Sequence, residues 1–157
     1  MVILQGFISG LIATILFDLF NYSLNYAYNI NKPKWYLLGR YFIGYRQRRY
    51  IRVSLENDEE EENELLWGYI IHYIIGIIYG LFYVCLNLSL FDYPSLLIAY
   101  LFGFITVLGA WCYLMPFAYS LGFFASNSDQ QFNILAQNLI GHFVFGTGLF
   151  IGYYISF

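Results

Sequence analysis

The sequence predicts an all-α membrane protein whose four transmembrane helices form an antiparallel bundle, with an interfacial segment in the first loop. Of its 157 residues, 60% are hydrophobic and only 11% are charged, whereas soluble domains carry about 25% charged residues. The chain also contains four apolar runs, each long enough to supply the roughly 20 residues that cross a hydrocarbon core. Its length fits a single membrane domain over residues 1–157.

The four apolar runs are expected to be helices, because a spanning segment has to satisfy all of its backbone hydrogen bonds internally. A barrel would need alternating strands, and these runs are apolar on all sides. Their expected bounds are 2–28, 65–88, 95–117 and 134–155.

The three connections differ in charge. The second is a short turn around Phe91–Pro94, and the third, about 118–133, is polar and carries Asp129 as its one charged residue. Loop 1, about 29–64, contains all seven Lys and Arg and then an acidic run. By the positive-inside rule, loops 1 and 3 are expected to be cytoplasmic and both termini to lie outside.

The basic half of loop 1 mixes aromatic side chains with arginines, which is typical of a membrane interface. Lipid-headgroup anchoring is the preferred interpretation, and a specific anionic-lipid or nucleotide site is the alternative. Nucleic acid is not expected as a partner, because the basic patch is small and lies beside the membrane. The residues predicted to lie at the lipid interface are Trp35, Arg40, Arg46, Arg48 and Arg49.

Three ionisable side chains interrupt the apolar spans, namely Asp18, His72 and His142. Ionisable groups inside a membrane are costly, and each one is therefore a functional hypothesis. Counted from the expected span ends at 1.5 Å per residue, all three lie roughly 12–15 Å below the cytoplasmic surface. We predict that they form one intramembrane polar site.

Small and polar residues recur every four positions beside these groups, so each group is expected to face other helices rather than lipid. Thr14, Asn21 and Asn138 are the candidate supporting residues around the site. Pro116 either frees a backbone carbonyl toward the same region or ends the third span. For each histidine the alternative role is a hydrogen-bonding strut between helices.

Three functions remain open. Asp18, His72 and His142 can bind a divalent metal ion or relay a proton, since one carboxylate and two imidazoles form a plausible ligand set and histidine titrates near neutrality. The two histidines can alternatively be the axial ligands of a b-type haem. A non-catalytic structural, assembly or lipid-interacting subunit is the third reading.

An enzymatic role is not expected, because no nucleophile accompanies the histidines. Membrane lipids are expected partners. Four spans enclose only a narrow path, so a transporter is expected to form a homo-oligomer or to join a partner membrane protein.

Several short motifs, in order along nearly the whole chain, resemble a family of small bacterial inner-membrane proteins known as domain of unknown function 2938. The resemblance implies a multi-pass protein of the bacterial inner membrane and puts Asp18, Arg40, His72, Pro116 and His142 on the family's characteristic positions. The family has no established activity. The motif residues are Gly10, Thr14 and Asp18; Leu38, Gly39, Arg40 and Tyr41; Trp67, Gly68, His72, Tyr73 and Gly76; Pro116, Gly122, Ala125 and Ser126; and His142, Phe145, Gly146, Gly148 and Leu149.

Overall fold

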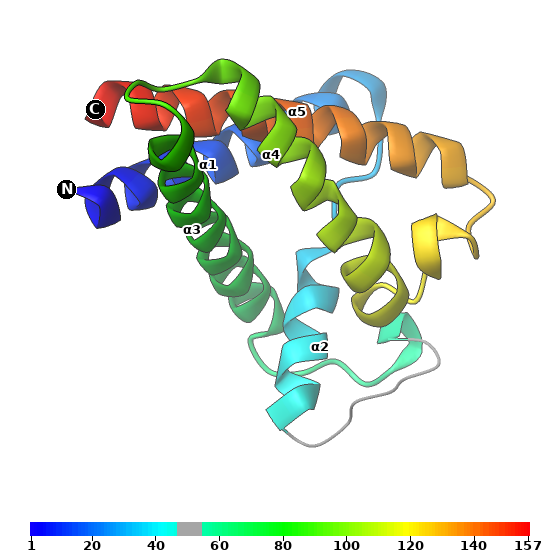
Figure 1. Ribbon diagram of the computed structural model, residues 1–157. Helices are drawn as coiled ribbons and strands as arrows, with labels where there is room; N and C mark the ends of the chain where they lie inside the picture. The colour runs from blue at the N-terminus through cyan, green and yellow to red at the C-terminus, as the bar shows by residue number, and fades with distance from the viewer. Residues whose placement is uncertain (47–54) are drawn as a thin grey trace. The chain divides into compact units, whose positions relative to one another are not determined.

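The computed structural model describes residues 1–46 and 55–157 (Figure 1). All regular structure in these two ranges is helical, which confirms the predicted all-α class. The elements are α1 (Val2–Tyr28), α2 (Trp35–Arg46), the short 3-10 helix η1 (Leu55–Asn57), α3 (Glu64–Leu90), α4 (Leu96–Gly109), the π-helix η2 (Ala110–Ala118), the 3-10 helix η3 (Phe123–Ala125) and α5 (Gln131–Ser156).

Four helical segments are long and apolar enough to cross a membrane, as predicted. They contain 27, 27, 23 and 26 residues, and about 20 residues suffice for a typical hydrocarbon core. The third combines α4 and η2, and the last begins three residues before its expected start. These helices support a multi-pass membrane protein. The spans are Val2–Tyr28, Glu64–Leu90, Leu96–Ala118 and Gln131–Ser156.

Polar side chains define where helices end. At the end of α1, Asn29 adopts the left-handed conformation (φ 56°) and its N–H bonds the Asn25 carbonyl, an arrangement that asparagine tolerates well. Between α3 and α4, the buried Asn87 amide donates to the Tyr93 carbonyl at 2.7 Å and accepts from the Ser95 N–H at 2.9 Å. Asn87 thereby closes the predicted turn around Phe91–Pro94.

The chain divides into two compact units, which are described separately. The first unit contains 1–32, 73–107 and 139–157; the second contains 33–72 and 108–138.

In the first unit, α1 packs closely against both α3 and α5 through small residues. A Cβ atom on Gly10 would overlap the backbone of Gly76, and one on Gly148 would lie 2.5 Å from the Cα of Ala13. Small residues of this kind let membrane helices approach until their backbones touch. The contacts run in opposite directions along the two helices of each pair, so α1 is antiparallel to both neighbours. Figure 1 shows the opposite directions of α1 and α5.

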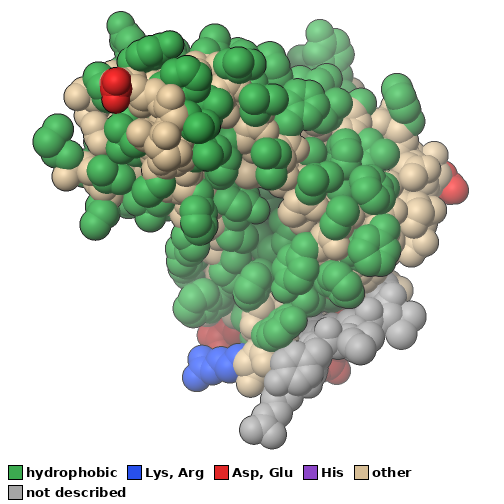
Figure 2. Space-filling view, in the orientation of Figure 1, with side chains coloured by type: hydrophobic (Ala, Val, Ile, Leu, Met, Phe, Trp, Pro, Cys, Tyr) green, Lys and Arg blue, Asp and Glu red, His purple; other side chains and the backbone are tan. Residues whose placement is uncertain are grey.

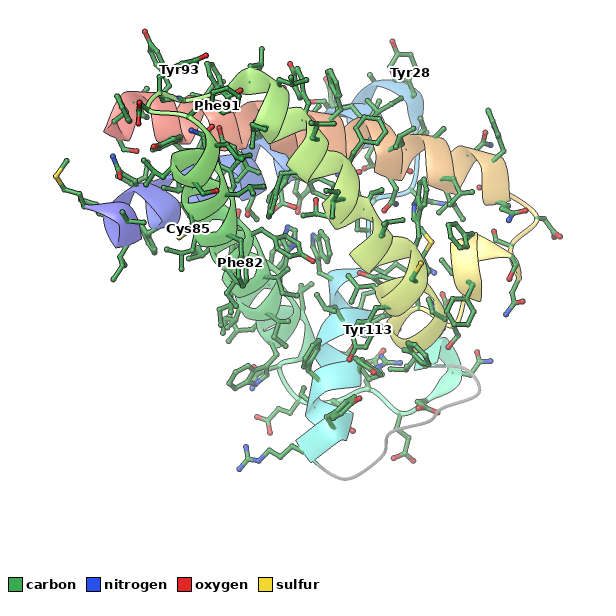
Figure 3. All side chains as sticks on the ribbon, in the orientation of Figure 1. Tyr28, Phe82, Cys85, Phe91, Tyr93 and Tyr113 are labelled. Carbon is green, nitrogen blue, oxygen red and sulfur yellow. The ribbon has the colours of Figure 1, made fainter. Side chains whose placement is uncertain are left out.

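The outward side of α3 in the first unit is apolar. Ile74, Ile78, Phe82 and Leu86 are exposed at four-residue spacing, which places them on one helix face. Figure 2 shows hydrophobic side chains over most of the face in view, and Figure 3 labels Phe82 and Cys85 on α3. Such a stripe suits contact with lipid tails.

In the second unit, α2 packs against the first turns of α3. A Cβ atom on Gly39 would overlap the carbonyl oxygen of Glu64, and one on Gly68 would overlap that of Trp35. Helix α2 also contacts η2, which carries Tyr113 (Figure 3). The Tyr41 and Tyr113 hydroxyls lie 3.3 Å apart. The predicted interfacial segment is therefore a helix folded onto its own unit.

Candidate functional site

Asp18 is buried in the first unit with 7% of its surface exposed. It lies on α1 between two other buried polar side chains, Thr14 and Asn21. The Thr14 hydroxyl donates to the Gly10 carbonyl at 2.8 Å, and the Asn21 amide donates to the Phe17 carbonyl at 2.9 Å. The Thr14 and Asn21 side chains are thus each fixed by a hydrogen bond to the backbone of α1.

Tyr73 on α3 is the neighbour that the sequence reasoning missed. Its hydroxyl donates a hydrogen bond to the Asp18 carboxylate. The close contact of α1 and α3 makes this possible, because the Thr14 hydroxyl occupies the space that a side chain on Gly76 would fill. One turn further along the antiparallel pair, Asp18 and Tyr73 face each other.

His142 lies beside the same part of α1. Its ring meets the Phe17 ring edge-on, with centroids 5.5 Å apart. Gly141 permits this approach, because a Cβ atom there would lie 2.8 Å from the ring of Phe17. Since Phe17 precedes Asp18 directly, His142 lies close to the level of Asp18 along α1.

His72 belongs to the second unit, where it stacks on Trp35 with ring centroids 3.8 Å apart and an interplanar angle of 21°. Asn138 belongs to that unit as well. Over residues 1–46 and 55–157, no group of three or more His, Cys, Asp and Glu side chains gathers where it could hold a metal ion. The three-residue metal set and the haem ligation therefore stay predictions.

A buried ion pair organises the second unit. Arg40 is only 2% exposed, and its guanidinium donates to both Glu64 carboxylate oxygens at 2.7 and 2.8 Å. The same side chain donates to the carbonyls of Leu55 at 2.8 Å and Asp58 at 3.0 Å. The bidentate contact with Glu64 raises the pKa of Arg40 above its ordinary value.

Two residues of the lipid-interface prediction, Arg40 and Trp35, are buried among protein groups, because α2 folds against the start of α3. Their contact with lipid stays a prediction. Arg46 is exposed at the end of α2, as an anchoring residue would be. Arg48 and Arg49 lie outside the described residues.

Comparison with known proteins identifies a family but no activity. The sequence profile of a family described as "Protein of unknown function (DUF2938)" matches residues 7–156. No curated protein and no solved structure matches the chain. The match agrees with the resemblance carried by the sequence motifs.

Proposed function

We propose a function from the site itself, because this chain belongs to the DUF2938 family of proteins of unknown function: Asp18 binds and releases a proton within the membrane and supports proton transport across it. The observation that carries the proposal is a carboxyl group buried in an apolar span and hydrogen-bonded by a neutral phenol. A carboxylate in such a place is costly unless it is paired or protonated.

Tyr73 suits both protonation states of Asp18. A phenol hydroxyl is a donor and an acceptor. It donates to the ionised carboxylate, and after protonation it can accept a hydrogen bond from the carboxylic acid. The contact with Tyr73 therefore survives the gain and loss of a proton, which a strictly donating partner such as arginine would not permit.

His142 supplies a titratable neighbour in the same unit. Imidazole exchanges protons near neutral pH, and the ring lies against Phe17, next to Asp18 in the sequence. We therefore assign His142 the role of a proton donor or acceptor for the Asp18 region. A proton is preferred to a metal ion, because the described residues contain no three-ligand group.

We further propose that loops 1 and 3 face the cytoplasm of a bacterial cell, in keeping with the positive charge of loop 1. On this orientation Asp18 lies nearer the cytoplasmic end of α1, and protons reach it from that side.

Infrared difference spectroscopy of the reconstituted protein tests the proposal directly. A carboxylic-acid C=O band should grow as the pH falls, should disappear in Asp18→Asn and should move in Tyr73→Phe, because its hydrogen bond is lost. Asp92→Asn, which changes an exposed acid in the α3–α4 turn, is the matched control and should leave this band in place.

Proton flux is the functional readout. Liposomes that contain a pH-sensitive dye should show proton uptake driven by a membrane potential with wild type and Asp92→Asn, and only the protein-free leak with Asp18→Asn. Absence of any Asp18-dependent band across the pH range in which the protein stays folded would contradict proton binding. Equal flux through wild type and Asp18→Asn would contradict the transport role.

A further inference from the structure

A second candidate site lies in the other unit, around the π-helix η2. The Trp111 indole Nε1 and the Tyr119 hydroxyl are buried, and neither has a hydrogen-bond partner among the residues that the structure describes. Buried donors without acceptors are rare, because each one costs the desolvation of a polar group. Trp111 lies within η2 and Tyr119 caps its C-terminal end, so the two unused donors belong to one segment.

The backbone of this segment is unusual in a way that functional sites share. Ala110–Ala118 is π-helical, and π-helical turns occur frequently at functional sites. Pro116 lies inside it and has no N–H to donate. The segment that carries the two donors without acceptors therefore also has an irregular helical backbone.

The connection after η2 carries further strain. Ser120, Phe124 and Ala125 all adopt positive φ angles of 54–55°, and Gly122 has φ 73°. Non-glycine residues in this conformation persist when surrounding structure holds them, and they cluster at ligand clamps and active sites. This stretch returns to η2, because the Phe124 ring contacts the Trp111 ring with centroids 5.6 Å apart.

The chemistry around the donors defines the ligand class. Residues 110–128 contain no Lys, Arg, Asp or Glu, so the segment offers no charge to an ion or a phosphate. Phe117, Phe123 and Phe124 make it aromatic. Burial raises the pKa of Tyr119 above its ordinary value, so the hydroxyl keeps its proton and remains a donor at physiological pH.

We propose that the η2 segment binds the uncharged, carbonyl-bearing part of a membrane molecule through two carbonyl oxygens, one accepting from Trp111 Nε1 and one from the Tyr119 hydroxyl. Two sources share this chemistry: a membrane quinone, with two ring carbonyls, and a phospholipid, with two acyl-ester carbonyls. Both present an apolar body and neutral acceptors, and both are dissolved in the bilayer that the spans cross.

Isotope-edited infrared spectroscopy distinguishes the sources. Delipidated protein is mixed either with a short-chain benzoquinone labelled with ¹³C at its carbonyls or with a phosphatidylcholine labelled at its ester carbonyls. The carbonyl band of the ligand that occupies the site should move to lower frequency and saturate with added ligand. A shift with the quinone identifies the first source, and a shift with the phospholipid alone identifies the second.

Conservative variants connect the shift to the donors. Tyr119→Phe removes the O–H donor and Trp111→Phe removes the N–H donor, and both variants keep an aromatic ring. Each should weaken binding of the ligand whose carbonyl band shifts by roughly five- to tenfold, which corresponds to the loss of one neutral hydrogen bond. Tyr113→Phe is the matched control in the same π-helix, since its hydroxyl contacts Tyr41. It should leave the affinity unchanged.

Stability of the ligand-free protein is the second readout. Because the Tyr119 hydroxyl is unused without ligand, Tyr119→Phe should leave the melting temperature unchanged or raise it, whereas Tyr113→Phe should lower it. The proposal is overturned if neither labelled carbonyl shifts. It is also overturned if Tyr119→Phe lowers the melting temperature and leaves the affinity unchanged, because the hydroxyl would then be bonded inside the protein.

Discussion

Each unit holds one carboxylate largely out of solvent, and the partners of the two carboxylates differ. In the second unit, Glu64 accepts two hydrogen bonds from the Arg40 guanidinium. In the first unit, Asp18 meets a phenol hydroxyl from Tyr73. An arginine keeps its proton throughout the physiological range, so it holds its partner ionised. A phenol imposes no charge on its partner, which agrees with the proton exchange proposed for Asp18, whereas the Arg40 contact gives Glu64 a structural role.

The largest expected effect is the loss of the ion pair. Arg40→Met should destabilise the protein by about 3–5 kcal/mol, because it leaves the Glu64 carboxylate without its buried partner and breaks the contacts to two backbone carbonyls. Reversible unfolding in mixed micelles measures the change. The double variant Arg40→Met/Glu64→Met should recover much of the loss, since no charge then stays buried.

The exposed pair Lys34–Glu56 provides the control for that experiment. Its side chains are 45% and 55% exposed, and surface pairs contribute at most about 1 kcal/mol. Lys34→Met should therefore change the free energy of unfolding by less than about 1 kcal/mol. If Arg40→Met cost no more than Lys34→Met, the structural role of the buried pair would be wrong.

The next two variants alter the helix packing around Asp18 and leave the charged groups unchanged. Gly10→Ala should cost roughly 1–3 kcal/mol, because its methyl group meets the backbone of α3, which cannot move aside easily. Gly141→Ala should cost less, because its methyl group meets only the ring of Phe17. Unfolding measurements give both values, and the infrared band of Asp18 should shift in Gly10→Ala, where Tyr73 is displaced. Equal costs for the two alanines would contradict the close backbone contact.

Removing the phenol hydroxyl has a smaller effect. Tyr73→Phe should destabilise the protein by about 1 kcal/mol, the net value of one hydrogen bond. The loss should be larger at high pH than at low pH, since an ionised carboxylate needs the donor more than a neutral acid does. Unfolding measured across pH tests this. A loss of stability that is independent of pH would indicate that Asp18 keeps one protonation state.

Residue patterns predicted the spans well, because long apolar runs have few alternatives in a folded chain. They also make Asp18 a candidate, since an acid inside such a run is conspicuous. Tyr73 was not predicted, because adjacent helical residues point about 100° apart and the four-residue pattern that contains His72 does not include its neighbour. The π-helix η2 was not predicted, because a run that is apolar on all sides has no hydrophobic periodicity that distinguishes π-helical from α-helical turns.

The pairing of Arg40 with an acid was not predicted, because arginines among aromatic residues look alike in sequence, whether they face headgroups or pair with a carboxylate. Its partner Glu64 stands 24 residues away, at the end of an acidic run that resembles a solvated linker. Only the packing of α2 on the first turns of α3 reveals which of those acids pairs. Local patterns do not contain that tertiary information.

The smallest expected effect on stability is also the sharpest test of the comparison. Asp18→Asn keeps an oxygen that can accept from Tyr73 and removes the buried charge, so the free energy of unfolding should change by less than about 0.5 kcal/mol, or rise. Glu64→Gln, the same chemical change in the other unit, should cost several kcal/mol, because it leaves the buried Arg40 guanidinium uncompensated. Parallel unfolding curves measure both. A large loss in Asp18→Asn would mean that the carboxylate is ionised and strongly paired like Glu64, and the distinction between a structural acid and an exchangeable one would then fail.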